Sequence, residues 1–110
     1  MAADGPTALS AALDRMWHAH LPELLERVDI LEASAQAFAA GPLPVDRQRA
    51  AQAAAHKLAG VLGTFGLTSG TVLARELEIM YSRQNDTEAE SAERLATIAA
   101  ELRALIENRK

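Results

Sequence analysis

Apolar residues recur at intervals of three and four along most of this 110-residue chain, and this period is the strongest constraint on its fold. It is clearest near the C-terminus, in the series Ala92, Leu95, Ala99, Leu102 and Ile106. Such a series lies on one face of an α-helix, whereas a half-buried strand alternates with a period of two. Only 4% of the residues are aromatic, which also favours helices over strands. The sequence therefore predicts an all-α fold.

Proline and glycine divide the pattern into five helical segments. A first helix is expected from Thr7, its N-cap, to about His20, and Pro22 then lies in the first turn of a second helix. Gly41-Pro42-Leu43-Pro44 ends the second helix, because two prolines in four residues cannot continue it. Gly66 is expected to end the third, since glycine readily adopts the left-handed conformation that follows many helices.

The starts of the later helices are indicated by polar capping residues. Asp46 is the expected N-cap of the third helix, and Thr68 or Ser69 caps a fourth helix that ends at about Ser82. Thr87 has the capping-box spacing to a glutamate three residues later and is expected to begin the last helix.

Short turns between amphipathic helices favour an antiparallel bundle. We expect an up-down-up-down four-helix bundle with an additional short N-terminal helix across one end. Residues 1–6 are expected to be disordered, and residues 7–110 to form a single domain. The expected core consists of Leu9, Leu13, Met16, Trp17, Leu24, Leu25, Val28, Leu31, Ala35, Phe38, Ala51, Ala55, Leu58, Leu62, Phe65, Val72, Leu73, Leu77, Met80, Ala92, Leu95, Ala99, Leu102 and Ile106.

Charge and composition exclude several classes of function. The net charge of −4 and the absence of a run of Lys or Arg argue against a nucleic-acid partner. The sequence has no signal peptide and no apolar run that could span a bilayer, so we expect a cytoplasmic protein without a membrane partner. It has no cysteine, and His18 and His20 point about 200° apart on a helix, so no metal site is expected.

One histidine lies in a setting that favours contact with another protein. At about 100° per residue, His56 shares a helix face with Gln52, Ala59, Gly60 and Gly63. The imidazole is therefore expected to face solvent among small side chains that allow close approach. An isolated helical histidine is more often a structural or plain surface residue, so a functional role for His56 depends on the pattern of residues around it.

That pattern resembles the histidine-containing phosphotransfer (HPt) domains of bacterial multistep phosphorelays. The family has a histidine, then leucine two residues later, a glycine four residues later and another ten residues later, followed by a helix that ends in Leu-Glu. His56, Leu58, Gly60, Gly66 and Leu77-Glu78 fit this pattern. The resemblance extends loosely from about Leu9 to Arg109.

The resemblance implies that His56 accepts a phosphoryl group from a receiver-domain aspartate and passes it to another. Gln52, Lys57, Ala59, Gly60 and Gly63 would contact the phosphoryl group or the partner, while Leu58 and Gly66 would be structural. The family has lysine at the position of Ala59, and here a lysine stands instead at Lys57, rotated by about 100° from His56. Loss of that cation would tune the transfer rather than prevent it.

The implied protein is a phosphocarrier with half of an active site, and not an autonomous enzyme. Phosphoryl transfer depends mainly on positioning and electrostatics, so the chain would need no cofactor of its own, and the partner receiver would supply Mg²⁺. Its partners would be response-regulator receivers and a hybrid histidine kinase, with the protein itself a monomer. Two alternatives stay open: a bundle of the same fold that binds a receiver or kinase without carrying phosphate, and a helical bundle used for oligomerisation.

Overall fold

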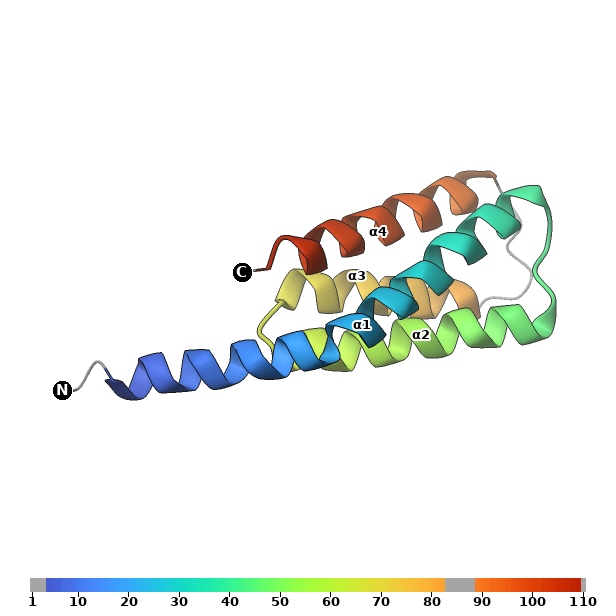
Figure 1. The fold of residues 1–110 in the computed structure, drawn as a ribbon. Coiled ribbons are helices and arrows are strands. Elements are labelled where there is room, and N and C mark those ends of the chain that lie inside the picture. Colours follow the sequence, from blue (N-terminus) through green and yellow to red (C-terminus); the bar gives the residue numbers. More distant parts are fainter. Residues whose placement is uncertain (1–3, 83–88, 110) are drawn as a thin grey trace.

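Four helices make up the structure, which is a computed structural model that describes residues 4–82 and 89–109. The helices are α1 (Asp4–Ala40), α2 (Val45–Thr64), α3 (Thr68–Ser82) and α4 (Ala89–Glu107), and no strand occurs in these two ranges. Each helix packs against two others, in the order α1, α2, α3, α4 and back to α1. Successive helices run in opposite directions (Figure 1). The all-helical prediction is confirmed.

The separate short N-terminal helix does not form. Residues 4–40 are one continuous helix, α1, with Pro22 inside it. A proline within a helix removes one backbone hydrogen bond and strains the preceding turn, at a cost of about 3 kcal/mol. Trp17 and Leu24, on either side of Pro22, are both buried against the bundle, and Pro22 itself is exposed. Burial of these two side chains on one face offsets the missing bond and keeps the helix whole.

The N-terminal part of α1 differs from the expected arrangement. The helix begins at Asp4, so Thr7 is an internal residue and not the cap, and only residues 1–3 of the expected disordered segment lie outside the described residues. This part extends past the ends of the other helices (Figure 1). Leu9 is 63% and Met16 49% exposed, so their assignment to the core was wrong. They have no helix to pack against because the bundle begins near Trp17.

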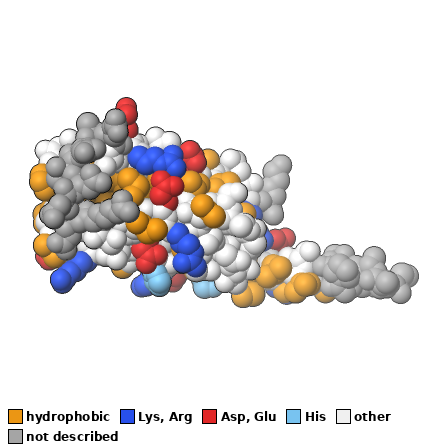
Figure 2. Space-filling view, turned by 180° about the vertical axis from the view of Figure 1, so that it is seen from behind, with side chains coloured by type: hydrophobic (Ala, Val, Ile, Leu, Met, Phe, Trp, Pro, Cys, Tyr) orange, Lys and Arg blue, Asp and Glu red, His pale blue; other side chains and the backbone are white. Residues whose placement is uncertain are grey.

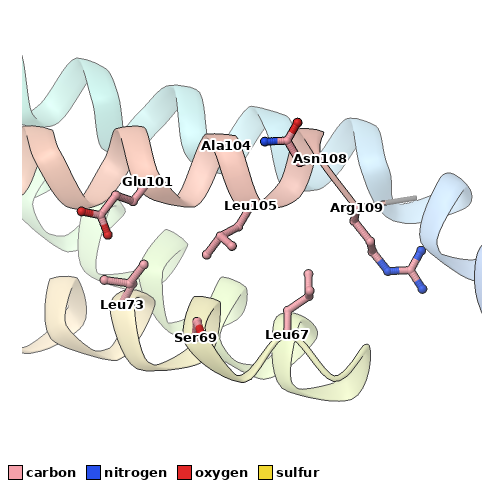
Figure 3. Close-up of a pocket in the computed structure, with 8 residues that line it drawn as sticks. All are labelled: Leu67, Ser69, Leu73, Glu101, Ala104, Leu105, Asn108 and Arg109. Carbon is pink, nitrogen blue, oxygen red and sulfur yellow. The ribbon is translucent and has the colours of Figure 1, made fainter.

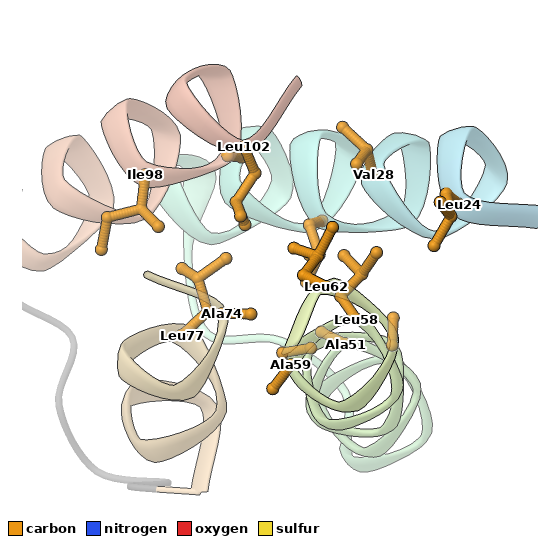
Figure 4. Packing of buried hydrophobic residues seen from close by; sticks show 14 of the residues in the cluster. Leu24, Val28, Ala51, Leu58, Ala59, Leu62, Ala74, Leu77, Ile98 and Leu102 are labelled. Atoms are coloured by element: carbon orange, nitrogen blue, oxygen red, sulfur yellow. The ribbon is translucent and has the colours of Figure 1, made fainter. Parts of the chain in front are cut away.

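A single hydrophobic core joins all four helices (Figure 4). Leu58 and Leu62 of α2 and Leu77 of α3 are completely buried, as are Ile98 and Leu102 of α4. Val72 is 60% exposed on the outer side of α3, so its assignment to the core was also wrong.

Tyr81 is buried at the C-terminal end of α3, and its hydroxyl has no hydrogen-bond partner among the described residues. Burial raises the pKa of Tyr81 to about 12, because the phenolate form is poorly solvated there.

The turn between α2 and α3 positions the two helices that carry the site. Gly66 has a φ of +76°, its backbone N–H donates to the Gly63 carbonyl at 3.1 Å, and the Leu67 N–H donates to the Leu62 carbonyl at 2.9 Å. These two bonds form a Schellman motif, which explains the glycine at position 66. It reverses the chain within three residues, and α3 therefore runs back along α2.

Helix starts differ from the capping predictions. Helix α2 begins at Val45 after Pro44, with no side-chain cap, so Asp46 lies in its first turn, where its charge still favours the helix dipole. Helix α3 begins at Thr68, which makes that residue part of the helix. Thr87, the predicted cap of α4, lies outside the described residues.

Candidate functional site

The His56 imidazole lies on the outer side of α2 and is held from the neighbouring helix. Its side chain is 71% exposed, and its Nδ1 lies 2.8 Å from Oε2 of Glu78 on α3. Figure 2 shows histidine side chains along the lower edge of the molecule, with acidic and basic side chains beside them. An exposed imidazole that is fixed on one side only can be approached by a second protein from the other.

Neutral contacts between α2 and α3 set the register that brings Glu78 to His56. The Thr71 hydroxyl donates to the Ala59 carbonyl at 3.0 Å, and the Gln48 side-chain amide donates to the Tyr81 carbonyl at 2.5 Å. A Cβ placed on Gly63 would lie 3.3 Å from the Thr71 hydroxyl, so the helices approach closely there. Because the helices are antiparallel, Glu78 comes level with His56 between these two bonds.

The bond to Glu78 determines which imidazole nitrogen is available. An ionised carboxylate can only accept hydrogen bonds, so the proton of the shared bond belongs to Nδ1. In the neutral imidazole Nε2 then carries the free lone pair. Nδ1 is turned toward α3, and Nε2 is the nitrogen open to an incoming electrophile.

Most of the predicted site residues are at least partly exposed on α2. Lys57, Gly60 and Gly63 are exposed on α2, and Gln52 is half-buried one turn before His56. A Cβ on Gly60 would meet no atom within 4 Å, so the space beside His56 is open and this glycine is not required for packing within the chain. Leu58 is fully buried beneath the site.

Ala59 does not share the face of His56. It is only 3% exposed and belongs to the core on the side of α2 that packs against α3. The prediction that Ala59 contacts a partner was therefore wrong. At about 100° per residue, Ala59 lies near the edge of the apolar stripe, and the closeness of α3 decides that this edge is covered.

Sequence reasoning gave no role to two residues that the fold brings to the site. Glu78 appears in the sequence only as the acidic end of the Leu-Glu pair, and its bond to His56 spans 22 residues. Arg75 lies one turn earlier on α3. Together with Gln52, Glu78, Ile79 and Ser82 it lines a groove of about 300 Å³ between α2 and α3. Only the register of these two helices reveals either residue, and no local sequence signal does.

A second groove, of about 520 Å³, lies between α3 and α4 and is lined in part by Leu67, Leu73 and Leu105 (Figure 3). It is largely apolar and is formed on the α4 side of α3, whereas Glu78 lies on the α2 side. Within residues 4–82 and 89–109, no group of three or more His, Cys, Asp or Glu side chains could hold a metal ion. None of the helices in these ranges is long and apolar enough to cross a membrane.

Comparison with protein families agrees with this geometry, because residues 10–108 match the model of the Hpt domain. The chain belongs to the Hpt domain family. A curated relative of this Hpt domain, protein RcaC of Microchaete diplosiphon, is 33% identical over 92 residues, which are 84% of this chain and 14% of the relative. The chain thus spans a small part of that relative's length. No solved structure matches it. Membership of the family supports a histidine phosphotransfer role in a phosphorelay.

Proposed function

We propose that this Hpt domain accepts a phosphoryl group on His56 from a phosphorylated aspartate of a receiver domain and passes it to an aspartate of another. The observation that carries the proposal is the exposed His56 imidazole, bonded through Nδ1 to Glu78 at 2.8 Å. That bond leaves Nε2 as the nucleophile on the open side of α2. A histidine kept for packing would be buried, and this side chain is 71% exposed.

The transfer step follows from this tautomer. The Nε2 lone pair forms a bond to phosphorus while the bond between phosphorus and the aspartate oxygen breaks, and the electron pair leaves with the carboxylate. The ring becomes positively charged, and the Glu78 carboxylate stabilises it through the Nδ1 proton, which stays on the ring or moves toward Glu78. The return step to a second aspartate reverses these changes.

The partner would complete the active site. We expect the receiver domain to bring the Mg²⁺ that neutralises the phosphoryl oxygens, since phosphoryl transfer depends on charge stabilisation and alignment. Gly60 leaves the space that such a partner needs, and Gln52 and Gly63 lie on the same face of α2, with Lys57 exposed about 100° around the helix from His56. We further propose that the protein acts as a cytoplasmic monomer, with a hybrid histidine kinase as a further source of phosphate.

The proposal is tested by labelling the protein with a receiver domain that has first been phosphorylated by acetyl phosphate. We expect an acid-labile, alkali-stable phosphoprotein, and no label in His56→Gln. His18→Gln is the matched control, because His18 is also an exposed histidine on a helix. A His56→Gln variant that labels as well as the wild type would overturn the assignment.

A second candidate function rests on the alanine at position 59, where the family's lysine is missing. The protein would then bind a receiver or kinase as an interaction module without carrying phosphate. Receiver binding with no label on His56 would favour this module. Transfer to and from His56 would exclude it.

A further inference from the structure

A phosphoryl group on Nε2 of His56 would bring two negative charges close to the carboxylate of Glu78. The carboxylate favours the positively charged ring but repels phosphoryl oxygens, so a nearby cation is needed for a favourable balance. Helix α2 does not supply one from the turn after His56, because Ala59 and Gly60 stand there and Ala59 is buried.

Lys57 lies on the wrong side of α2 for this task. Gln52, His56 and Gly63 fall within about 40° of one another on the side of α2 that leads to α3. Lys57 is rotated by about 100° from His56 in the opposite sense, toward the side that packs on α1. Lys57 therefore lies on the side of α2 away from Glu78 and does not line the groove that Glu78 lines.

Arg75 lies on the correct side. It precedes Glu78 by three residues on α3, so the two side chains lie on neighbouring faces one turn apart. Because α3 runs antiparallel to α2, one turn back from Glu78 is one turn forward from His56, at the level of Ala59 and Gly60. Arg75 also lines the same groove as Glu78 and Gln52.

Arg75 differs from the arginines that are already held in ion pairs. Arg94 is bonded to Glu76, Arg103 to Glu32 and Asp29, and Arg109 to Asp14. Arg75 is exposed and forms no ion pair or side-chain hydrogen bond with any residue that the structure describes. Its guanidinium is therefore available for an anion.

We propose that Arg75 binds the phosphoryl group on His56 and supplies the cation that α2 lacks. This inference rests on the proposed function. The planar guanidinium donates two parallel hydrogen bonds to phosphoryl oxygens, while Glu78 holds Nδ1 of the same ring. Arg75 and Glu78 line the same groove of about 300 Å³, so the cation lies on the same side as the carboxylate that holds the ring.

The test uses potassium phosphoramidate, a small donor that phosphorylates histidine without a partner protein and so separates chemistry from docking. Arg75→Ala is expected to slow labelling of His56 about tenfold, as loss of one charge-assisted contact in a partly solvated site would. Arg75→Lys should recover part of the rate, because a lysine keeps the charge but loses the paired geometry. Arg47→Ala is the matched control, because Arg47 is also an exposed arginine and lines a separate groove with Glu26 and Asp29, and its rate should stay within about twofold of the wild type.

Two further readouts exclude a merely structural effect. Raising the salt concentration should slow the labelling of wild-type His56 but leave the labelling rate of Arg75→Ala unchanged. The helical circular dichroism of Arg75→Ala and Arg75→Gln should equal that of the wild type. Equal rates for Arg75→Ala and the wild type, or an equal loss in Arg47→Ala, would overturn the role of Arg75 while leaving the phosphocarrier intact. Absence of label on wild-type His56 with both phosphoramidate and phosphorylated receiver would instead overturn the proposed function itself.

Discussion

The helix α4 is attached to its neighbours by charged side chains, whereas α2 and α3 meet through neutral ones. Arg103 of α4 donates to both carboxylate oxygens of Glu32 on α1, at 2.9 and 2.7 Å, and also to Asp29. Between α2 and α3 the contacts are the Thr71 and Gln48 hydrogen bonds and the close approach at Gly63. His56 and Glu78 form the one ionisable pair between α2 and α3 within the described ranges.

The C-terminal end of the chain belongs to the charged region as well. The Arg109 guanidinium lies over the Trp17 ring at 4.7 Å and over the Phe65 ring at 5.5 Å, and it pairs with Asp14 at 3.3 Å. The Trp17 and Phe65 rings meet edge to face at 5.2 Å. The cations in this region pair with carboxylates and aromatic rings of the same chain and so hold the helices together. The neutral packing of α2 against α3 leaves the His56–Glu78 pair, and Arg75 in the groove beside Glu78, available for chemistry.

The largest expected effect is the difference in stability between substitutions in the core of α2 and on its outer side. Leu58→Ala should lower the free energy of unfolding by about 2–5 kcal/mol, because it leaves a cavity where Leu58 is completely buried. His56→Ala, two residues earlier, should change it by less than about 0.5 kcal/mol, since the side chain is exposed. Urea denaturation measures both. A loss above 2 kcal/mol for His56→Ala would mean that the His56 and Glu78 pair holds the helices together.

The next effect tests the charged interface. Arg103→Ala should lower the free energy of unfolding by about 1–2 kcal/mol, because the Arg103 side chain is only 28% exposed and its loss leaves neighbouring carboxylates without a cation. The loss should shrink in 1 M salt. Thr71→Val is the control at the neutral interface, and its smaller loss should not depend on salt. Equal salt dependence of the two variants would remove the distinction between the interfaces.

A smaller effect concerns the open space beside His56. Gly60→Ala should raise the free energy of unfolding by about 0.5–1 kcal/mol, because alanine favours the helix and its Cβ meets no atom within 4 Å. Gly63→Ala should gain less, since its Cβ would lie 3.3 Å from the Thr71 hydroxyl. Thermal unfolding of the two variants measures the difference.

The functional readout of the same position uses a larger side chain. Gly60→Leu should slow transfer from a phosphorylated receiver but leave labelling by phosphoramidate unchanged, because only the protein partner needs the space. Equal effects on both donors would show that Gly60 acts on the chemistry of His56 and not on docking.

Much of the fold could be predicted from the sequence because it depends on local signals. The apolar period gave the helices and most of the core, and the glycine at position 66 marked the end of α2. The continuity of α1 through Pro22 was missed, because the burial of Trp17 and Leu24 against other helices decides it. Local rules describe a proline within a helix as a break.

Only part of the candidate site could be predicted from the sequence, for a similar reason. The exposure of His56 and the space at Gly60 follow from positions on one helix. The roles of Glu78 and Arg75 depend on how α3 is aligned along α2, and that alignment is set by contacts 12 to 33 residues apart in the chain. Ala59 was misplaced because the same alignment decides which edge of α2 is covered.

The smallest expected effect is a pH dependence at the junction of α3 and α4. The Arg94 guanidinium donates to both oxygens of Glu76, at 2.7 and 2.9 Å, and these hydrogen bonds lower the pKa of the Glu76 carboxyl from its ordinary 4.5. A carboxyl whose pKa is lower in the folded state adds stability above the unfolded pKa and loses it as the pH falls through the folded value.

Glu76→Gln should therefore have a lower Tm than the wild type at pH 7, and the difference should disappear as the pH falls from 5 to 3. The difference should be small, because 37% of the Glu76 side chain and 47% of the Arg94 side chain are exposed, and 1 M salt should reduce it further. Thermal unfolding at several pH values checks this. A difference in Tm that stayed constant from pH 7 to pH 3 would mean that Glu76 contributes by packing and not by charge, and the contrast between α4 and the neutral α2–α3 interface would then rest on Arg103 and Arg109 alone.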